Sequence, residues 1–239
     1  TNGSIRGVYS SVFAQKKQGS CAAAMKQLVL PILVSMVPLI SQCCPAADRV
    51  ATARKNVAPQ LAEHFGRAVF LRIIKEDYKL ELWLQKPDGG WELFRSYEIA
   101  AMSGDLGPKT QEGDEQAPEG FYRVFPHALN PRSAYHLSFN IGYPNKYDKS
   151  LGRTGSYIMV HGSDVSIGCF AMTNPVIEEI YTLVNEAFKN GCPSIPVQVY
   201  PFRMTPERMQ QEALEYDDRE AFVIEYLNTL LPADWYEWS

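Results

Sequence analysis

One histidine and one cysteine lie eight residues apart in a segment whose residue types suit nucleophilic catalysis. His161 and Cys169 belong to residues 157–173, which read YIMVHGSDVSIGCFAMT. A cysteine attacks a carbonyl group as the thiolate, and because the free thiol has a pKa of about 8.5, it needs an adjacent base or cation. The pattern therefore suits Cys169 as a nucleophile with His161 as its general base.

Two further residues of the same segment suit this chemistry. Gly168 allows the backbone to bend tightly beside Cys169, where the N–H groups of both residues would form an oxyanion hole. Ser166 would support the loop or hydrogen-bond the reaction intermediate. The alternative is structural: Cys169 is then a buried small residue, and His161 a hydrogen-bonded residue near a turn.

The elements that must position this pair are mostly β-strands. Leu80, Leu82 and Leu84 occupy every second position of one apolar run, which is the period of a strand with one face in a core. Residues 87–90, Pro-Asp-Gly-Gly, form a strong turn after it. Strands are predicted over 68–74, 78–84, 91–101, 121–125, 158–160 and 197–200. Together they indicate a mixed, β-rich α+β fold.

Helices are predicted around this β-rich part. Residues 174–190 form an amphipathic helix with Asn174 as its N-cap. Further helices are predicted from Thr205 onward and over 221–231, as covering elements without catalytic residues. Residues 48–65 are predicted as a helical or irregular lead-in.

The composition indicates one catalytic domain. The chain has 239 residues, 46% of them apolar, and a net charge of -4, which suffices for one substantial core. We expect the catalytic domain over 66–204 and a helical extension over 205–239. Phosphate binding needs concentrated Lys and Arg, so nucleic acid is not expected as a partner. Nothing in the chain fixes an oligomeric state, and we expect a monomer.

Residues 1–47 predict an exported protein. They contain four basic residues and no acidic one. The segment that starts at Met25 has the order of a signal peptide. Lys26 comes first, then the apolar run 28–40, and then the small residues of 41–47. The apolar run is shorter than the roughly 20 residues that span a bilayer. A retained anchor, a buried segment and lipidation of Cys43 are the alternatives, and residues 1–24 are read as added residues or an upstream start.

No cofactor is expected. Cys169 and Cys192 are the cysteines that follow the leader, and we predict that they do not form a disulfide, because it would consume the nucleophile. The sequence contains no CxxC motif or Cys/His cluster for zinc, no glycine-rich phosphate loop and no dinucleotide-binding motif.

The pattern H-G-x3-S-x-G-C resembles the active-site motif of the YkuD-type L,D-transpeptidase family, with a shortened gap between His-Gly and Ser-x-Gly-Cys. Further similar residues follow the family's order at 107–109, 113–114, 118–122, 140–145 and 147–148. Residues 200–205, YPFRMT, resemble the YafK branch of the family. The resemblance covers about residues 66–235 and implies a β-sandwich catalytic domain with covering C-terminal helices.

The resemblance implies a cell-envelope cysteine acyl-transferase that acts on peptidoglycan stem peptides. Cys169 would form a thioester, His161 would carry the proton, and the backbone carbonyl of Gly162 would orient the imidazole. An amine of diaminopimelate, a lysine of an envelope lipoprotein, or water would then resolve the thioester.

The choice among these acceptors stays open. The YafK branch is associated with hydrolysis that releases lipoprotein from diaminopimelate of peptidoglycan. Residues 170–172 read Phe-Ala-Met where many members carry an arginine, which favours the hydrolytic amidase and puts the usual recognition of a substrate carboxylate in doubt. A catalytically inert peptidoglycan-binding module is the alternative of another class.

Four residues are predicted to contact substrate. Lys109 lies in the long loop 103–120, which borders the substrate groove in the resembling family. Tyr143 lies in an aromatic turn suited to lining a cleft, and Arg153 is the cation nearest the motif, placed to pair with a substrate carboxylate. His136 is read as a groove or packing residue. The alternative for Lys109 is a solvated or turn-stabilising residue, and the alternative for Tyr143 is core or turn packing.

Overall fold

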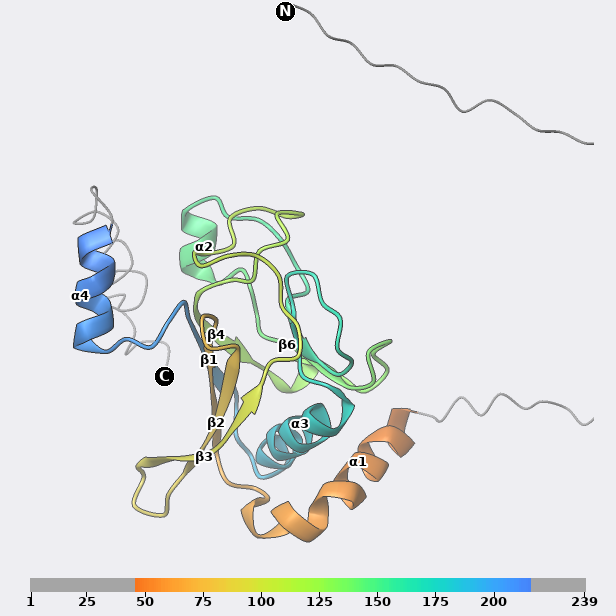
Figure 1. Ribbon diagram of the computed structural model, residues 1–239. Coiled ribbons are helices and arrows are strands. Elements are labelled where there is room, and N and C mark those ends of the chain that lie inside the picture. Colours follow the sequence, from red (N-terminus) through yellow and green to blue (C-terminus); the bar gives the residue numbers. More distant parts are fainter. Residues whose placement is uncertain (1–45, 216–239) are drawn as a thin grey trace, which may run out of the picture. The chain divides into compact units, whose positions relative to one another are not determined.

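The computed structural model of the protein describes residues 46–215 (Figure 1). The helices are α1 (Ala46–Leu61), α2 (Lys146–Ser150), α3 (Asn174–Lys189) and α4 (Pro206–Glu215), with 3-10 turns η1 (Ala62–His64) and η2 (Pro126–Ala128). The strands are β1 (Val69–Ile74), β2 (Lys79–Gln85), β3 (Trp91–Glu98), β4 (Gly120–Val124), β5 (Leu129–Asn130), β6 (Ser138–Asn140), β7 (Met159–His161), β8 (Phe170–Ala171) and β9 (Ile195–Tyr200). The predicted leader up to residue 45 and the predicted helix over 221–231 lie outside the described residues.

Two sheets share one apolar core. The first has the strand order β3-β2-β1-β9-β4 and the second the order β5-β6-β7-β8. Most neighbouring strands are antiparallel, but β1 pairs with β9, and β7 with β8, in parallel. Leu82 of β2, Val160 of β7 and Ile180 of α3 have no exposed surface and belong to one continuous cluster. The predicted mixed α+β fold is confirmed.

Helix α3 is covered by the N-terminal helix α1, which runs alongside it in Figure 1. Ala53 and Leu61 of α1 are fully buried. Polar contacts flank this apolar seam: the Arg54 side chain donates to Glu186 (3.0 Å) and the Asn56 amide to Glu178 (2.9 Å). The predicted lead-in is therefore a helix that packs on the domain. Within residues 46–215 no helix is long and apolar enough to cross a bilayer.

The chain between Cys169 and α3 differs from the prediction. It forms the short strand β8 before the helix, and Thr173, not Asn174, occupies the N-cap position. Asn174 is the first helical residue, and its side-chain oxygen accepts a hydrogen bond from the Ser163 N–H at 2.9 Å. This contact ties the loop after β7 to the start of α3.

The outer face of β2 is not open to solvent. Leu80, Leu82 and Leu84 are fully buried, as the alternating pattern predicts, but Glu81 on the opposite face is also only 2% exposed. Arg203 donates to the Glu81 carboxylate at 2.8 Å. The segment after β9 therefore covers this face, which a strand pattern alone does not reveal.

A buried ion pair anchors the long loop between β3 and β4. Lys75, at the end of β1, and Glu119, just before β4, are 1% and 2% exposed, and their charged atoms lie 2.9 Å apart. The Lys75 ammonium also donates to the carbonyls of Gly107 (2.8 Å) and Ala117 (3.0 Å). One lysine thus fixes both ends of a loop that reaches the candidate site.

Candidate active site

The parallel pair β7 and β8 brings the predicted histidine and cysteine to one face of the smaller sheet. Val160 pairs with Phe170, and His161 with Ala171. Because side chains alternate along strands, Cys169, which directly precedes β8, lies on the His161 face. The structure therefore brings together two residues that sequence alone could only place on a common segment.

The His161 ring is held in the form of a base. Its Nδ1 lies 2.6 Å from the carbonyl oxygen of Gly162, and because a carbonyl only accepts, Nδ1 carries the hydrogen and Nε2 keeps its lone pair. The ring is buried, and Tyr135 packs on it with 4.8 Å between ring centroids. Burial lowers the pKa of His161, although the hydrogen bond to Gly162 opposes this effect.

The Cys169 thiol is held by backbone groups. Its Sγ accepts a hydrogen bond from the Met159 N–H at 3.3 Å and lies 3.5 Å from the carbonyl oxygen of Tyr157, to which it donates. Burial raises the pKa of Cys169, and the Met159 N–H and the charge of Lys109 only partly offset this. The thiol is thus protonated near neutral pH and needs a base to become a nucleophile.

Within the described part of the chain, the hydrogen bonds of the Cys169 thiol and the His161 ring go to backbone groups and do not join the two side chains. The thiol hydrogen instead points to the Tyr157 carbonyl. Catalytic hydrogen bonds are often long or absent in structures without substrate and tighten when substrate binds. Rotation of the thiol about its side-chain bond would turn its hydrogen away from Tyr157.

Gly162 occupies a position that no larger residue fits. A Cβ atom there would lie 2.6 Å from the side-chain oxygen of Asn174 and 2.8 Å from the Tyr135 carbonyl oxygen. Such distances are shorter than atomic contacts allow. The close approach holds Gly162 in place, with its carbonyl oxygen at hydrogen-bond distance from His161 Nδ1.

The oxyanion-hole prediction needs a correction at Gly168. Its φ of 75° is in the left-handed region that glycine tolerates. The Gly168 N–H, however, donates to the Ser103 hydroxyl at 2.7 Å, and that hydroxyl donates to the Glu115 carbonyl at 2.6 Å. The Gly168 N–H is therefore engaged, and Cys169 supplies the other predicted donor.

Sequence reasoning missed Ser103 and Tyr135, which hold the cysteine loop and the histidine ring. The long-range pairings that give them these roles leave no local pattern in the sequence. Ser166 was expected to support the loop or the intermediate, but its hydroxyl oxygen is buried and has no hydrogen-bond partner within residues 46–215. Its predicted role stays a prediction.

Two of the four predicted substrate contacts are cations that already have partners. Lys109 is 5% exposed and its ammonium donates to Asp114. The Arg153 guanidinium pairs with Asp148 at 3.0 Å, and both side chains are buried. Burial alone would raise the pKa of Asp114, but its hydrogen bonds from Lys109 and from backbone N–H groups hold that pKa well below its usual range. The contact of each cation with substrate stays a prediction.

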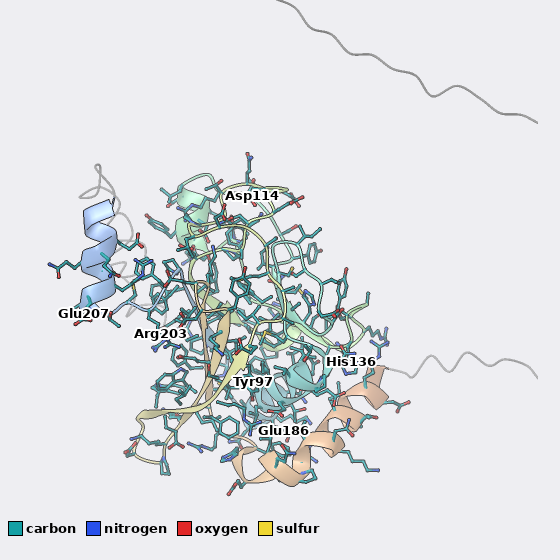
Figure 2. All side chains as sticks on the ribbon, viewed as in Figure 1. Tyr97, Asp114, His136, Glu186, Arg203 and Glu207 are labelled. Carbon is teal, nitrogen blue, oxygen red and sulfur yellow. The ribbon has the colours of Figure 1, made fainter. Side chains whose placement is uncertain are left out.

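The other two predicted contacts differ from each other. Tyr143 is 4% exposed, and its hydroxyl lies 3.1 Å from the carbonyl oxygens of Lys109 and Thr154, so it is a packing residue under the loop. His136 hydrogen-bonds Glu178 of α3 at 2.8 Å and lines an open pocket of about 460 Å³. Figure 2 shows His136 near α3, well separated from Asp114 on the long loop.

Exposed apolar side chains flank the cysteine. Tyr157 is 76% exposed, Ile167 71% and Val165 58%, which are the highest values among the large apolar residues within 46–215. All three lie within twelve positions of Cys169 in the sequence. Isolated exposed apolar residues are ordinary, but a concentration of them beside a reactive group is typical of a binding surface.

A metal site needs several ligating side chains close together. No group of three or more His, Cys, Asp or Glu side chains within residues 46–215 is arranged to hold an ion. Cys169 and Cys192 are both free thiols.

Comparison with known proteins identifies relatives of this arrangement. The L,D-transpeptidase catalytic domain family, YkuD, matches residues 75–199. Two Escherichia coli proteins, each named "Putative L,D-transpeptidase YafK", from strains K12 and O157:H7, are 39% identical over 189 residues, which cover 78% of this chain and 75% of theirs. The helical cell shape determining protein Pgp2 of Campylobacter jejuni has a solved structure that is 21% identical, with a TM-score of 0.45 over 66% of this chain. The match spans 56% of the length of Pgp2.

Proposed function

Because the chain belongs to the YkuD family of L,D-transpeptidase catalytic domains, we propose that it is a cell-envelope cysteine acyl-transferase that acts on peptidoglycan stem peptides. The observation that carries this proposal is the geometry of His161. Its Nδ1–H donates to Gly162 and leaves Nε2 unprotonated, on the sheet face that also carries Cys169. The family match supplies the substrate class.

In the first half of the proposed reaction, the Cys169 thiol gives its proton to His161 Nε2. The sulfur then forms a bond to the carbonyl carbon of a stem-peptide amide. The tetrahedral intermediate collapses, the carbon–nitrogen bond breaks, and the His161 proton passes to the leaving amine. The product is a thioester between Cys169 and the acyl group.

The protein stabilises charge at two places in this half-reaction. The Gly162 carbonyl accepts the hydrogen bond from Nδ1–H throughout, and this hydrogen bond becomes stronger when the ring is cationic. The Cys169 N–H would bind the developing oxyanion. One preorganised donor of this kind contributes roughly 3 to 4 kcal/mol.

In the second half, an amine or water attacks the thioester carbon, and His161 removes the proton of the attacking group. The carbon–sulfur bond then breaks, and the proton returns from His161 to the Cys169 sulfur. An amine of diaminopimelate would make a cross-link, whereas water would complete an amidase reaction. The hydrolytic reaction that releases lipoprotein from diaminopimelate of peptidoglycan is the second candidate. The Phe170-Ala171-Met172 sequence, without the arginine of many members, favours it.

The proposed location is the cell envelope, where peptidoglycan lies, and export would depend on the predicted signal peptide. The proposed partners are diaminopimelate-containing stem peptides and, for the second candidate, an envelope lipoprotein. The protein would act as a monomer.

The test compares products by mass spectrometry. The full chain, Cys169→Ala and the matched control Cys192→Ala are incubated with tetrapeptide muropeptides and with lipoprotein-linked muropeptides. Cross-linked products that require Cys169 support transpeptidation, and cleavage of the lipoprotein linkage without cross-links supports the amidase. No turnover by the full chain contradicts both candidates and leaves the inert binding module, whereas equal turnover by Cys169→Ala contradicts catalysis through Cys169.

A further inference from the structure

Ser138 of β6 lies directly opposite His161 of β7. The two residues are paired in an antiparallel ladder. The next pair along the ladder is hydrogen-bonded, since the Gly162 N–H donates to the Leu137 carbonyl at 3.1 Å. Ser138 and His161 therefore form a non-hydrogen-bonded pair, in which side chains on a common face approach most closely. Their Cβ atoms are about 4.5 to 5.5 Å apart in such pairs.

The Ser138 hydroxyl is buried and unsatisfied. Ser138 is 1% exposed, and its oxygen has no hydrogen-bond partner within the described residues. A buried hydroxyl without a partner loses its hydrogen bonds to water and gains nothing in return. On the same face, His161 is 3% exposed, and among the described residues its ring hydrogen-bonds through Nδ1 alone.

Proton transfer would change what the His161 ring needs. A neutral imidazole has one N–H donor, whereas the imidazolium has two. The Gly162 carbonyl satisfies Nδ1–H in both forms. After the ring takes the Cys169 proton, Nε2–H is a second donor in a buried site, and the Ser138 hydroxyl, on the cross-strand neighbour of His161, is an acceptor without a partner in the described residues.

We infer that Ser138 is a positioning residue for the general base, whose hydroxyl accepts the Nε2–H hydrogen bond of His161 while the ring holds the Cys169 proton. This inference rests on the proposed function. The step moves one proton from Sγ to Nε2 and leaves the electron pair on sulfur. Ser138 itself neither gains nor loses a proton. Rotation about the Ser138 side-chain bonds would form the contact, because the two groups are not bonded in the present arrangement and His161 keeps its bond to Gly162.

Titratable and charged side chains also lie near the cysteine–histidine pair. Tyr135 is the titratable group packed on the His161 ring. Lys109 is the cation whose charge reaches Cys169, and it is paired with Asp114. The pKa of Asp114 is held well below its usual range, so this carboxylate keeps its charge while the cysteine–histidine pair titrates.

The test measures the reactivity of Cys169 without any substrate. The full chain, Ser138→Ala and Ser138→Thr are treated with iodoacetamide from about pH 5 to pH 9, and alkylation of the Cys169 peptide is followed by mass spectrometry. Loss of one charge-assisted hydrogen bond should slow alkylation of Ser138→Ala about tenfold near pH 7 and move its profile to higher pH. Ser138→Thr keeps the hydroxyl and should restore the profile.

Two results would overturn the inference. The first is an unchanged profile in Ser138→Ala. The second is an equal change in Ser138→Ala and Ser138→Thr together with a lower thermal midpoint in both, which would show a packing role only. His161→Ala separates this inference from the proposed function. If His161→Ala leaves the Cys169 profile unchanged, the assignment of His161 as general base is wrong. If His161→Ala changes the profile and Ser138→Ala does not, only the role of Ser138 is contradicted.

Discussion

The carbonyl of Gly162 orients the His161 ring through the Nδ1 hydrogen bond. The close approach of Gly162 to its neighbours fixes the position of that carbonyl. A methyl group at this position would meet the Asn174 side chain at 2.6 Å and the Tyr135 carbonyl at 2.8 Å. The backbone of Tyr135 is fixed, so the clash would be relieved by moving Gly162. The Nδ1 hydrogen bond would be lost with that movement.

Gly162→Ala is therefore expected to lose both stability and Cys169 reactivity. Overpacking of this kind costs about 1 to 3 kcal/mol of unfolding free energy, and alkylation of Cys169 near pH 7 should fall about tenfold or more. Urea denaturation and alkylation rates measure the two effects. Gly90→Ala is the matched control, because its methyl would meet only the side chains of Asp88 and Lys86. Equal behaviour of the two variants would contradict the close-approach argument.

The buried imidazole also makes stability depend on pH. Burial lowers the pKa of His161 in the folded protein, so below about pH 6.5 the unfolded chain binds a proton that the folded protein does not. Stability should therefore fall as the pH drops from about 6.5 toward the folded pKa.

His161→Gln removes this group and should flatten that part of the curve. The free energy of unfolding, measured by urea denaturation at pH 5, 6 and 7, should depend less on pH in the variant than in the unchanged chain. His136→Gln serves as the comparison for a histidine paired with Glu178. The same slope in His161→Gln and the unchanged chain would show that the ring is not desolvated.

At the scale of elements, the loop over 103–119 depends on the buried pair of Lys75 and Glu119. Burial lowers the pKa of Lys75 and raises that of Glu119, while their mutual attraction opposes both shifts. One Glu119 oxygen accepts from Lys75 and the Gly107 N–H, and the other has no partner within the described residues. Such a pair tolerates little change in either partner.

Lys75→Met should cost about 3 to 5 kcal/mol of unfolding free energy, because it leaves the Glu119 carboxylate buried without its cation. The double variant Lys75→Met with Glu119→Leu should recover much of that loss, and urea denaturation of the unchanged chain, the two single variants and the double variant gives the coupling. Lys79→Met breaks an ion pair with Glu98, which is 73% exposed, and should cost less than about 1 kcal/mol. Additive single effects would argue against a coupled anchor.

The elements that sequence predicted well are those with a local period. The alternation of Leu80, Leu82 and Leu84 predicted β2, and the apolar face around Ile180 predicted α3. Strand β8 was missed because two residues carry no period. The partners of Ser103 were missed for another reason: they are set by loop folding across 65 positions of sequence.

The candidate site divides in the same way. Cys169 and His161 are recognisable because their spacing belongs to one continuous motif. For Lys109 and Arg153, sequence shows a cation but not its buried carboxylate partner. Residue type therefore indicates the reactive groups, whereas the groups that hold them require the register and the contacts of the folded chain.

At the scale of the whole molecule, the first described helix supports the general base from a distant part of the chain. Arg49 of α1 donates to the carbonyls of Ser133 (2.9 Å) and His136 (3.0 Å). Tyr135 lies between these two acceptors and packs on the His161 ring. Helix α1 thus fixes both ends of the short segment that covers the imidazole.

Arg49→Ala should loosen this segment and lower Cys169 alkylation near pH 7 about two- to fivefold, since each lost hydrogen bond contributes on the order of 1 kcal/mol. The thermal midpoint should fall by only a few degrees, because the apolar seam of Ala53 and Leu61 remains. Arg54→Ala is the matched control: it lies on the same helix, is 47% exposed and contacts Glu186 instead. If Arg54→Ala lowers Cys169 reactivity as much as Arg49→Ala, α1 acts through general stability alone. A loss confined to Arg49→Ala would show that α1 contributes to the site through residues 133–136.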